Sequence, residues 1–189
     1  LWNAGRFILG TLDGPTRPLA GPHANAVRPE ELALADRWII ARCDATVRAA
    51  NEAYEKFRLN DAAAAVYHFL WSDLADWYIE QAKPRLYGSQ PGGDVARAVS
   101  AQTFDVALRL LHPVMPFVTE TLWKRLPGRA DADSVSVAPW PVPDDRATDD
   151  EALADAPTLL GTDRDVLQVG IGGTQPAGCR NELVERRVD

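Results

Sequence analysis

Apolar residues recur at helical spacing along the first third of the chain. Between positions 32 and 57 they follow one another three, four or seven residues apart, which puts them on one face of a helix. They are Leu32, Ile39, Cys43, Val47, Ala50, Tyr54 and Phe57. Pro29 followed by two glutamates is typical of a first helical turn. This pattern predicts a long amphipathic helix over residues 29–57.

The next segment is apolar on more than one side. Asn60 is a good N-cap, and the predicted helix runs over residues 61–83. Its apolar side chains cannot share one stripe, which indicates a helix at the centre of a bundle. They include Val66, Phe69, Leu70, Trp71, Leu74, Trp77, Tyr78 and Ile79. We assign the aromatic ones among them to the core.

Two more helices complete the predicted fold. Asp94 is a candidate cap for a third long helix, which His112 and the prolines after it end, and a shorter helix covers residues 117–126. Long helices joined by short turns favour an all-α, antiparallel helix bundle. Only residues 134–137 alternate polar and apolar side chains as a strand would. A helix to about residue 160 and then an irregular tail are predicted, so the domain is placed at 1–155 and the tail at 156–189.

Composition narrows the class of protein. Cys43 and Cys179 lie far apart and in no spaced pair, which fits a reducing compartment, so we expect a cytoplasmic protein. No apolar run is long enough for a bilayer, and no leader opens the chain. The chain starts at Leu1 in what reads as the last turns of a helix, so we expect a piece of a longer protein.

Charge is unevenly distributed. The net charge is -7, which counts against nucleic-acid binding. Residues 131–165, however, carry ten acids against Arg146 and Arg164, whereas the first 130 residues are close to neutral. A local basic surface is therefore compatible with the sequence, but a strong non-specific grip on a polyanion is not expected.

No constellation of catalytic or metal-binding residues stands out. Asp73, Asp76 and Glu80 lie on nearby helical turns, yet the Glu-x-x-His pair of a di-metal bundle is missing, and Glu80 has Lys83 as an ion-pair partner one turn on. Cys43 lies on an apolar helix face, where a buried thiol is usual. We therefore predict no catalytic residue, no metal site and no cofactor in this chain.

Trp2, Arg6 and Phe7 stand apart from the other aromatic positions. They lie beside the proline-rich loop at the predicted rim of the bundle. An aromatic ring next to an arginine at such a rim can stack an unpaired base and hold its phosphate. Plain packing explains the three residues equally well, so composition leaves both interpretations open.

Five runs of the sequence belong together: residues 1–7 (LWNAGRF), 34–39, 69–80, 112–120 and 139–141, which follow in order at fitting separations. Together they resemble the anticodon-binding domain of the valyl-tRNA synthetases, a class I family. Isoleucine and leucine enzymes share the bundle, but the Asp76-Trp77-Tyr78 form points to valine. The resemblance implies a binding module for the anticodon stem-loop of tRNA(Val).

The resemblance also implies a binding site. In the family, the aromatic matching Phe7 packs against an anticodon base, and Asn3 and Arg6 share its helix end. Arg37 and Arg48 project in similar directions on their predicted helix and are expected to meet backbone phosphates. The predicted tRNA-binding residues are therefore Asn3, Arg6, Phe7, Arg37 and Arg48.

The same resemblance sets limits on activity. The two ATP-binding signatures of class I synthetases do not occur in these 189 residues. Valine activation, with ATP and Mg²⁺, is therefore expected of the parent ligase, whose catalytic domain would be a partner of this one. The alternative is a helical protein-interaction module that keeps the fold without binding RNA.

Overall fold

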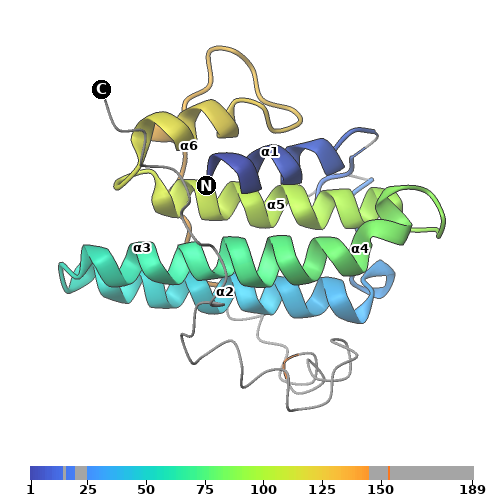
Figure 1. Cartoon of the computed structure of the whole chain (residues 1–189), viewed down its shortest axis with the longest axis horizontal. Coiled ribbons are helices and arrows are strands. Elements are labelled where there is room, and N and C mark those ends of the chain that lie inside the picture. Colours follow the sequence, from blue (N-terminus) through green and yellow to red (C-terminus); the bar gives the residue numbers. More distant parts are fainter. Residues whose placement is uncertain (15, 20–24, 145–152, 154–189) are drawn as a thin grey trace, which may run out of the picture.

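The computed structural model describes residues 1–14, 16–19, 25–144 and 153, and these form a bundle of helices (Figure 1). In chain order the elements are α1 (Trp2–Thr11), the 3₁₀ turn η1 (Pro29–Glu31), α2 (Leu34–Glu55), α3 (Leu59–His68), the π-helix η2 (Phe69–Tyr78), α4 (Ile79–Leu86), α5 (Gly93–Leu111), α6 (Pro116–Trp123) and the 3₁₀ turn η3 (Val135–Val137). The all-α prediction is confirmed.

Three long antiparallel rods make up the body of the bundle. They are α2, the continuous rod of α3, η2 and α4, and α5 (Figure 1). Each rod packs on the other two. Helix α1 lies along α5 and also contacts η2 and α6. None of the helices in the described part of the chain is long and apolar enough to cross a membrane.

The start of α2 differs from the prediction. Pro29 opens only the short turn η1, and the α-helix begins five residues later, at Leu34. There the Asp36 carboxylate accepts a hydrogen bond from the backbone N–H of Ala33, which caps the helix. The far end of α2 is closed by Phe57 in the left-handed conformation, with a φ of 56°.

The central rod is one helix with an unusual middle. Residues 69–78 adopt π-helical pairing, which the apolar pattern does not reveal because it sets a face and not the hydrogen-bond spacing. The rod begins at Leu59, so the prediction of Asn60 as N-cap was wrong, and Asn60 lies in the first turn.

One buried carboxylate ties the first rod to the second. Asp36 on α2 is fully buried and receives two hydrogen bonds of 2.7 Å from the Arg85 guanidinium on α4. The Tyr78 hydroxyl donates to the same carboxylate at 2.6 Å. Burial first, and then the Asp36 charge, raise the pKa of Tyr78 well above its usual value. The phenol therefore stays a neutral donor, and every partner in the cluster is satisfied.

Two further sequence predictions need correction. Residues 134–137 do not form a strand, because Val135–Val137 is a 3₁₀ turn that Ser134 caps by accepting from the Ser136 N–H. Of the aromatic residues assigned to the core, Tyr78 is buried and Trp77 packs partly buried against the core. Trp71 instead remains 45% exposed. The helix predicted to about residue 160 and the tail at 156–189 lie outside the described residues, apart from Leu153.

We expect the Arg85→Ala variant to lose about 3–5 kcal/mol of unfolding free energy, because the change leaves the Asp36 carboxylate buried without its ion partner. Urea unfolding measures the loss. Lys56→Ala is the matched control, since Lys56 pairs with Glu52 and both side chains are 59% exposed. It should shift stability by no more than about 0.5 kcal/mol, and equal losses in the two variants would contradict the assignment.

A second group of ion pairs, around Arg17, predicts that part of the stability of the fold is lost in acid. Arg17 bonds to Glu31 and Asp94 at 3.0 Å each, and it also donates to the backbone oxygen of Asn25. The hydrogen bonds from Arg17 lower the pKa of Glu31 from 4.5 to about 2. A depressed folded-state pKa stabilises the fold above pH 4.5, and this contribution disappears as the pH falls from 4.5 to 2.

The Glu31→Gln variant should therefore lose less stability than the parent chain over that pH interval. Urea midpoints measured at pH 6, 4 and 3, chosen to span roughly the titration range, test this expectation. Identical pH profiles for the two chains would show that the Arg17–Glu31 pair does not contribute to acid stability.

Candidate nucleic-acid interface

Helix α1 has one buried face and one exposed face. Ala4, Gly5, Ile8 and Thr11 are buried, and their spacing places them on the side that meets α5, α6 and η2. The opposite face is exposed, and it consists of Trp2, Asn3, Arg6, Phe7 and Gly10. Three of the five predicted tRNA-binding residues, Asn3, Arg6 and Phe7, thus lie on one surface.

The position of α1 on the bundle depends on a close contact between Gly5 and Leu122. A Cβ on Gly5 would stand 2.7 Å from Leu122 Cδ1, below any normal contact distance. The absence of a side chain at Gly5 therefore lets α1 come down onto α6. At Gly10, on the exposed face, an added Cβ would meet nothing within 4 Å.

Helix α6 is itself fixed by a buried charge. Asp105 on α5 accepts a 2.6 Å hydrogen bond from the Trp123 indole N–H at the end of α6. The same carboxylate pairs with Arg109 and Arg129, and the Arg129 guanidinium lies 4.0 Å from the centroid of the Trp123 ring. These contacts lock α6 against α5, and so they hold Leu122 where α1 rests on it.

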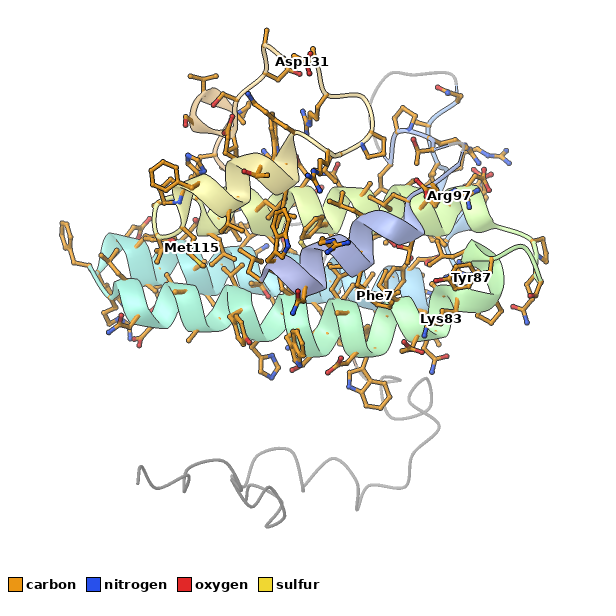
Figure 2. All side chains as sticks on the ribbon, turned by 45° about the horizontal axis from the view of Figure 1, so that its top comes forward. Phe7, Lys83, Tyr87, Arg97, Met115 and Asp131 are labelled. Carbon is orange, nitrogen blue, oxygen red and sulfur yellow. The ribbon has the colours of Figure 1, made fainter. Side chains whose placement is uncertain are left out.

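Phe7 borders a shallow depression between α1 and η2. The depression has a volume of about 280 Å³ and is lined by Asn3, Ala4, Phe7, Trp71, Ala75, Asp76 and Glu80. The Phe7 ring is 39% exposed, and the ammonium of Lys83 on α4 lies 5.7 Å from its centroid. Figure 2 shows Phe7 and Lys83 facing each other across this edge of the bundle. The ring is therefore open to a planar partner.

The charged residues that line the depression are both acidic, and Lys83 lies beside them. Lys83 forms an ion pair with Glu80 one turn before it, as the sequence predicted. Glu80 and Asp76 add carboxylate oxygens to the lining. These carboxylates repel a phosphate, but they suit the edge of a base, because carboxylates accept hydrogen bonds from exocyclic amino groups. The geometry therefore favours contact with a base over contact with the RNA backbone.

Arg37 and Arg48 lie elsewhere. Both belong to α2, which lies across the bundle from α1 (Figure 1). The Arg48 guanidinium bonds to Asp44 at 3.0 Å, and Asp44 also accepts from the backbone N–H of Asp144. Arg48 thus neighbours the closing segment of the described chain, and the structure does not bring it to the surface of α1.

A larger cavity of about 580 Å³ lies between α2, α5 and the segment around Trp140. Cys43 lines it and is buried, as the apolar face predicted. Burial raises the pKa of the Cys43 thiol to about 12, so at neutral pH the thiol is protonated and a poor nucleophile. No group of three or more metal-ligating side chains occurs among the described residues.

Comparison with known proteins identifies the family of the chain. Residues 36–170 match the family model described as the anticodon-binding domain of tRNA ligase. The chain belongs to this family. It is 38% identical over 184 residues to the valine–tRNA ligase of Carboxydothermus hydrogenoformans, covering 97% of this chain and 20% of that protein. With the valine–tRNA ligase of Synechocystis it shares 46% identity over 134 residues, or 67% of this chain and 14% of the relative.

This chain of the anticodon-binding family therefore spans about a fifth of the length of the relatives it matches. The similarity to the Carboxydothermus protein extends over nearly the whole chain, so α1, which precedes the family-model match, has counterparts too. The resemblance seen in the five sequence runs is confirmed at the level of the family.

Sequence reasoning missed several residues of this surface. Trp71 was assigned to the core, yet it is 45% exposed and lines the depression. Lys83 was expected only as an ion-pair partner, and its position over Phe7 depends on how α4 meets α1. The helical spacing of Asn3 and Phe7 was the one signal that located the depression from sequence.

Gly5→Ala and Gly10→Ala make a matched pair within α1. Overpacking against Leu122 should cost the Gly5→Ala variant about 1–3 kcal/mol of stability and tilt α1. Gly10→Ala should leave stability unchanged or raise it by about 0.5–1 kcal/mol, because alanine is the better helix former at an exposed position. Thermal or urea unfolding of both variants tests the seat of α1, and a Gly5→Ala variant as stable as Gly10→Ala would contradict it.

Proposed function

We propose that this domain recognises the anticodon stem-loop of tRNA(Val) within a valine–tRNA ligase. The observation that carries the proposal is the half-exposed Phe7 ring beside a depression that offers an amide and two carboxylates. In this arrangement an unpaired base stacks on Phe7, while Asn3, Asp76 and Glu80 are placed to test the hydrogen-bonding edge of a base.

The proposal separates two kinds of contact. Phe7 and the side chains around it select a base, whereas cationic groups such as Arg6 hold the backbone and position the loop. Most cations of the described chain are already paired with carboxylates, so the electrostatic part of the affinity is expected to be small. Recognition would then rest mainly on stacking and on edge contacts.

The rest of the ligase supplies the chemistry in this proposal. Valine activation with ATP and Mg²⁺ and transfer to the tRNA are assigned to parts of the ligase outside these 189 residues, and the catalytic domain is a partner of this one. The two relatives described above are valine–tRNA ligases, which supports valine over the other class I amino acids. Arg37 and Arg48 would at most contact backbone at a distance from the Phe7 depression.

A second candidate is a helical interaction module that keeps the fold without binding RNA. The net charge of -7 and the carboxylates of the depression favour it. The two candidates differ in salt dependence, because RNA binding releases counterions from the phosphates and therefore weakens as the salt concentration rises. A chain that shows no binding to the tRNA(Val) anticodon hairpin at low salt supports the interaction module.

The Phe7→Ala variant should bind a tRNA(Val) anticodon hairpin more weakly by about 1–3 kcal/mol, the usual loss for one stacked base. Phe117→Ala is the control, because Phe117 is also a surface ring, 88% exposed, but stands at the start of α6 away from the depression. Fluorescence titration gives the affinities, and thermal melts confirm that both variants fold.

Two results would contradict the proposal. One is a Phe7→Ala chain that folds and binds the hairpin as tightly as the parent chain. The other is equal binding of the parent chain to hairpins whose anticodon bases have been exchanged, since the depression would then read no base.

A further inference from the structure

Two cations in the described part of the chain lack an acidic partner. The described residues hold fifteen lysines and arginines. Eleven of them form ion pairs with carboxylates. Arg37 and Arg97 have other interactions. Arg6 and Arg125 remain, and both side chains are exposed. In a chain with a net charge of -7, this pair of guanidinium groups is the local exception among the described residues.

Both arginines lie beside Trp2. The Arg125 guanidinium is held 5.4 Å from the centroid of the Trp2 ring. Arg6 follows Trp2 by four residues on α1, so the two side chains share a face. Trp2 itself remains 40% exposed although Arg125 lies over it. One exposed indole is thus accompanied by two guanidinium groups that no carboxylate in the described part of the chain neutralises.

The fold fixes this cluster from both sides. Trp2 and Arg6 are carried by α1, whose seat on Leu122 depends on Gly5. The backbone N–H of Arg125 donates to the Leu122 oxygen at 3.1 Å, and the next residue, Leu126, is buried. The same residue, Leu122, therefore supports both halves of the cluster, so the distance between them is set by packing.

We infer that Trp2, Arg6 and Arg125 form a second nucleotide subsite on α1, separate from the Phe7 depression. An unpaired base stacks on the exposed part of the Trp2 indole, and its phosphate receives N–H groups of Arg6 and Arg125. The ligand class is single-stranded RNA, and the inference rests on the proposed function, because the same RNA loop would occupy both subsites.

The spacing along α1 suits two bases that do not stack on each other. Trp2 and Phe7 are five residues apart, which is about 7.5 Å along the helix axis. Successive stacked bases lie about 3.4 Å apart. Helical geometry also turns the two rings toward opposite edges of the exposed face, at about 100° per residue, with Arg6 between them. The loop would therefore cross α1 with one base held at each edge.

The test uses the whole 189-residue chain and the tRNA(Val) anticodon hairpin as the probe. Trp2→Leu should weaken binding roughly 5- to 100-fold, the loss of one stacked base. Arg125→Gln should lower the slope of log affinity against log salt by about 1, the loss of one phosphate contact. Lys124→Gln removes the same charge one residue away, from a side chain already paired with Glu120, and should change neither quantity.

A coupled experiment identifies the base. Abasic nucleotides are placed at each loop position in turn, and each hairpin is titrated against the parent chain and Trp2→Leu. At the loop position whose base stacks on Trp2, the abasic change should weaken binding to the parent chain by the same factor as Trp2→Leu does. It should have no further effect on the Trp2→Leu chain. Trp2→Phe keeps a ring at the site and should retain most of the affinity, which controls for folding.

Three outcomes overturn the inference. The first is a folded Trp2→Leu chain that binds the hairpin like the parent chain. The second is that Trp2→Leu and each abasic change weaken binding by independent factors, so that no loop position is coupled to Trp2. The third is a salt slope for Arg125→Gln equal to that of Lys124→Gln. If Phe7→Ala weakens binding in the same titrations, only this inference fails, whereas no hairpin binding at all removes the proposed function with it.

Discussion

Gly5 is the point at which α1 meets the side chain of Leu122, and the candidate surface depends on that contact. With no side chain at Gly5, α1 can bury Ala4, Ile8 and Thr11 and leave its other face in solvent. The position of Leu122 depends in turn on the Asp105 carboxylate, which holds the end of α6 through Trp123 and Arg129. A buried charge on α5 thus determines, through two packing steps, where the exposed aromatic rings of α1 stand.

Buried carboxylates of this domain bind donors from neighbouring helices. The Asp36 and Asp105 carboxylates are buried and satisfied by arginine, tyrosine or tryptophan donors. Asp36 joins α2 to the central rod, and Asp105 joins α5 to α6. Such clusters consume cations that a nucleic-acid-binding surface would otherwise display. What remains on α1 is a small surface of stacking rings and few free guanidinium groups, which suits selective contact with unpaired bases better than a general grip on phosphate.

The helices were predictable because apolar spacing reports on helix faces, as for α2, and because His112 and the prolines after it mark the end of α5. The start of α2 was not, since Pro29 opens only a 3₁₀ turn. The π-helical middle of the central rod was not predictable, since it leaves the apolar pattern unchanged and alters only hydrogen-bond spacing. Trp71 was misplaced because apolar residues cover several sides of this rod, and the pattern does not show which of them stays at the surface. Asn3, Arg6 and Phe7 were found together because they are neighbours on one helix. Arg125 and Lys83 join them only through packing between helices, which no local pattern records.

The most direct test is NMR of the chain carrying labelled phenylalanine rings, titrated with the tRNA(Val) anticodon hairpin. The five phenylalanines include two rings that are more exposed than Phe7, namely Phe57 and Phe117, and these serve as internal controls. If α1 presents a base-stacking surface, the Phe7 resonances shift strongly upfield on binding, while those of Phe57 and Phe117 stay in place. An unshifted Phe7 ring in an RNA-bound chain would contradict the account.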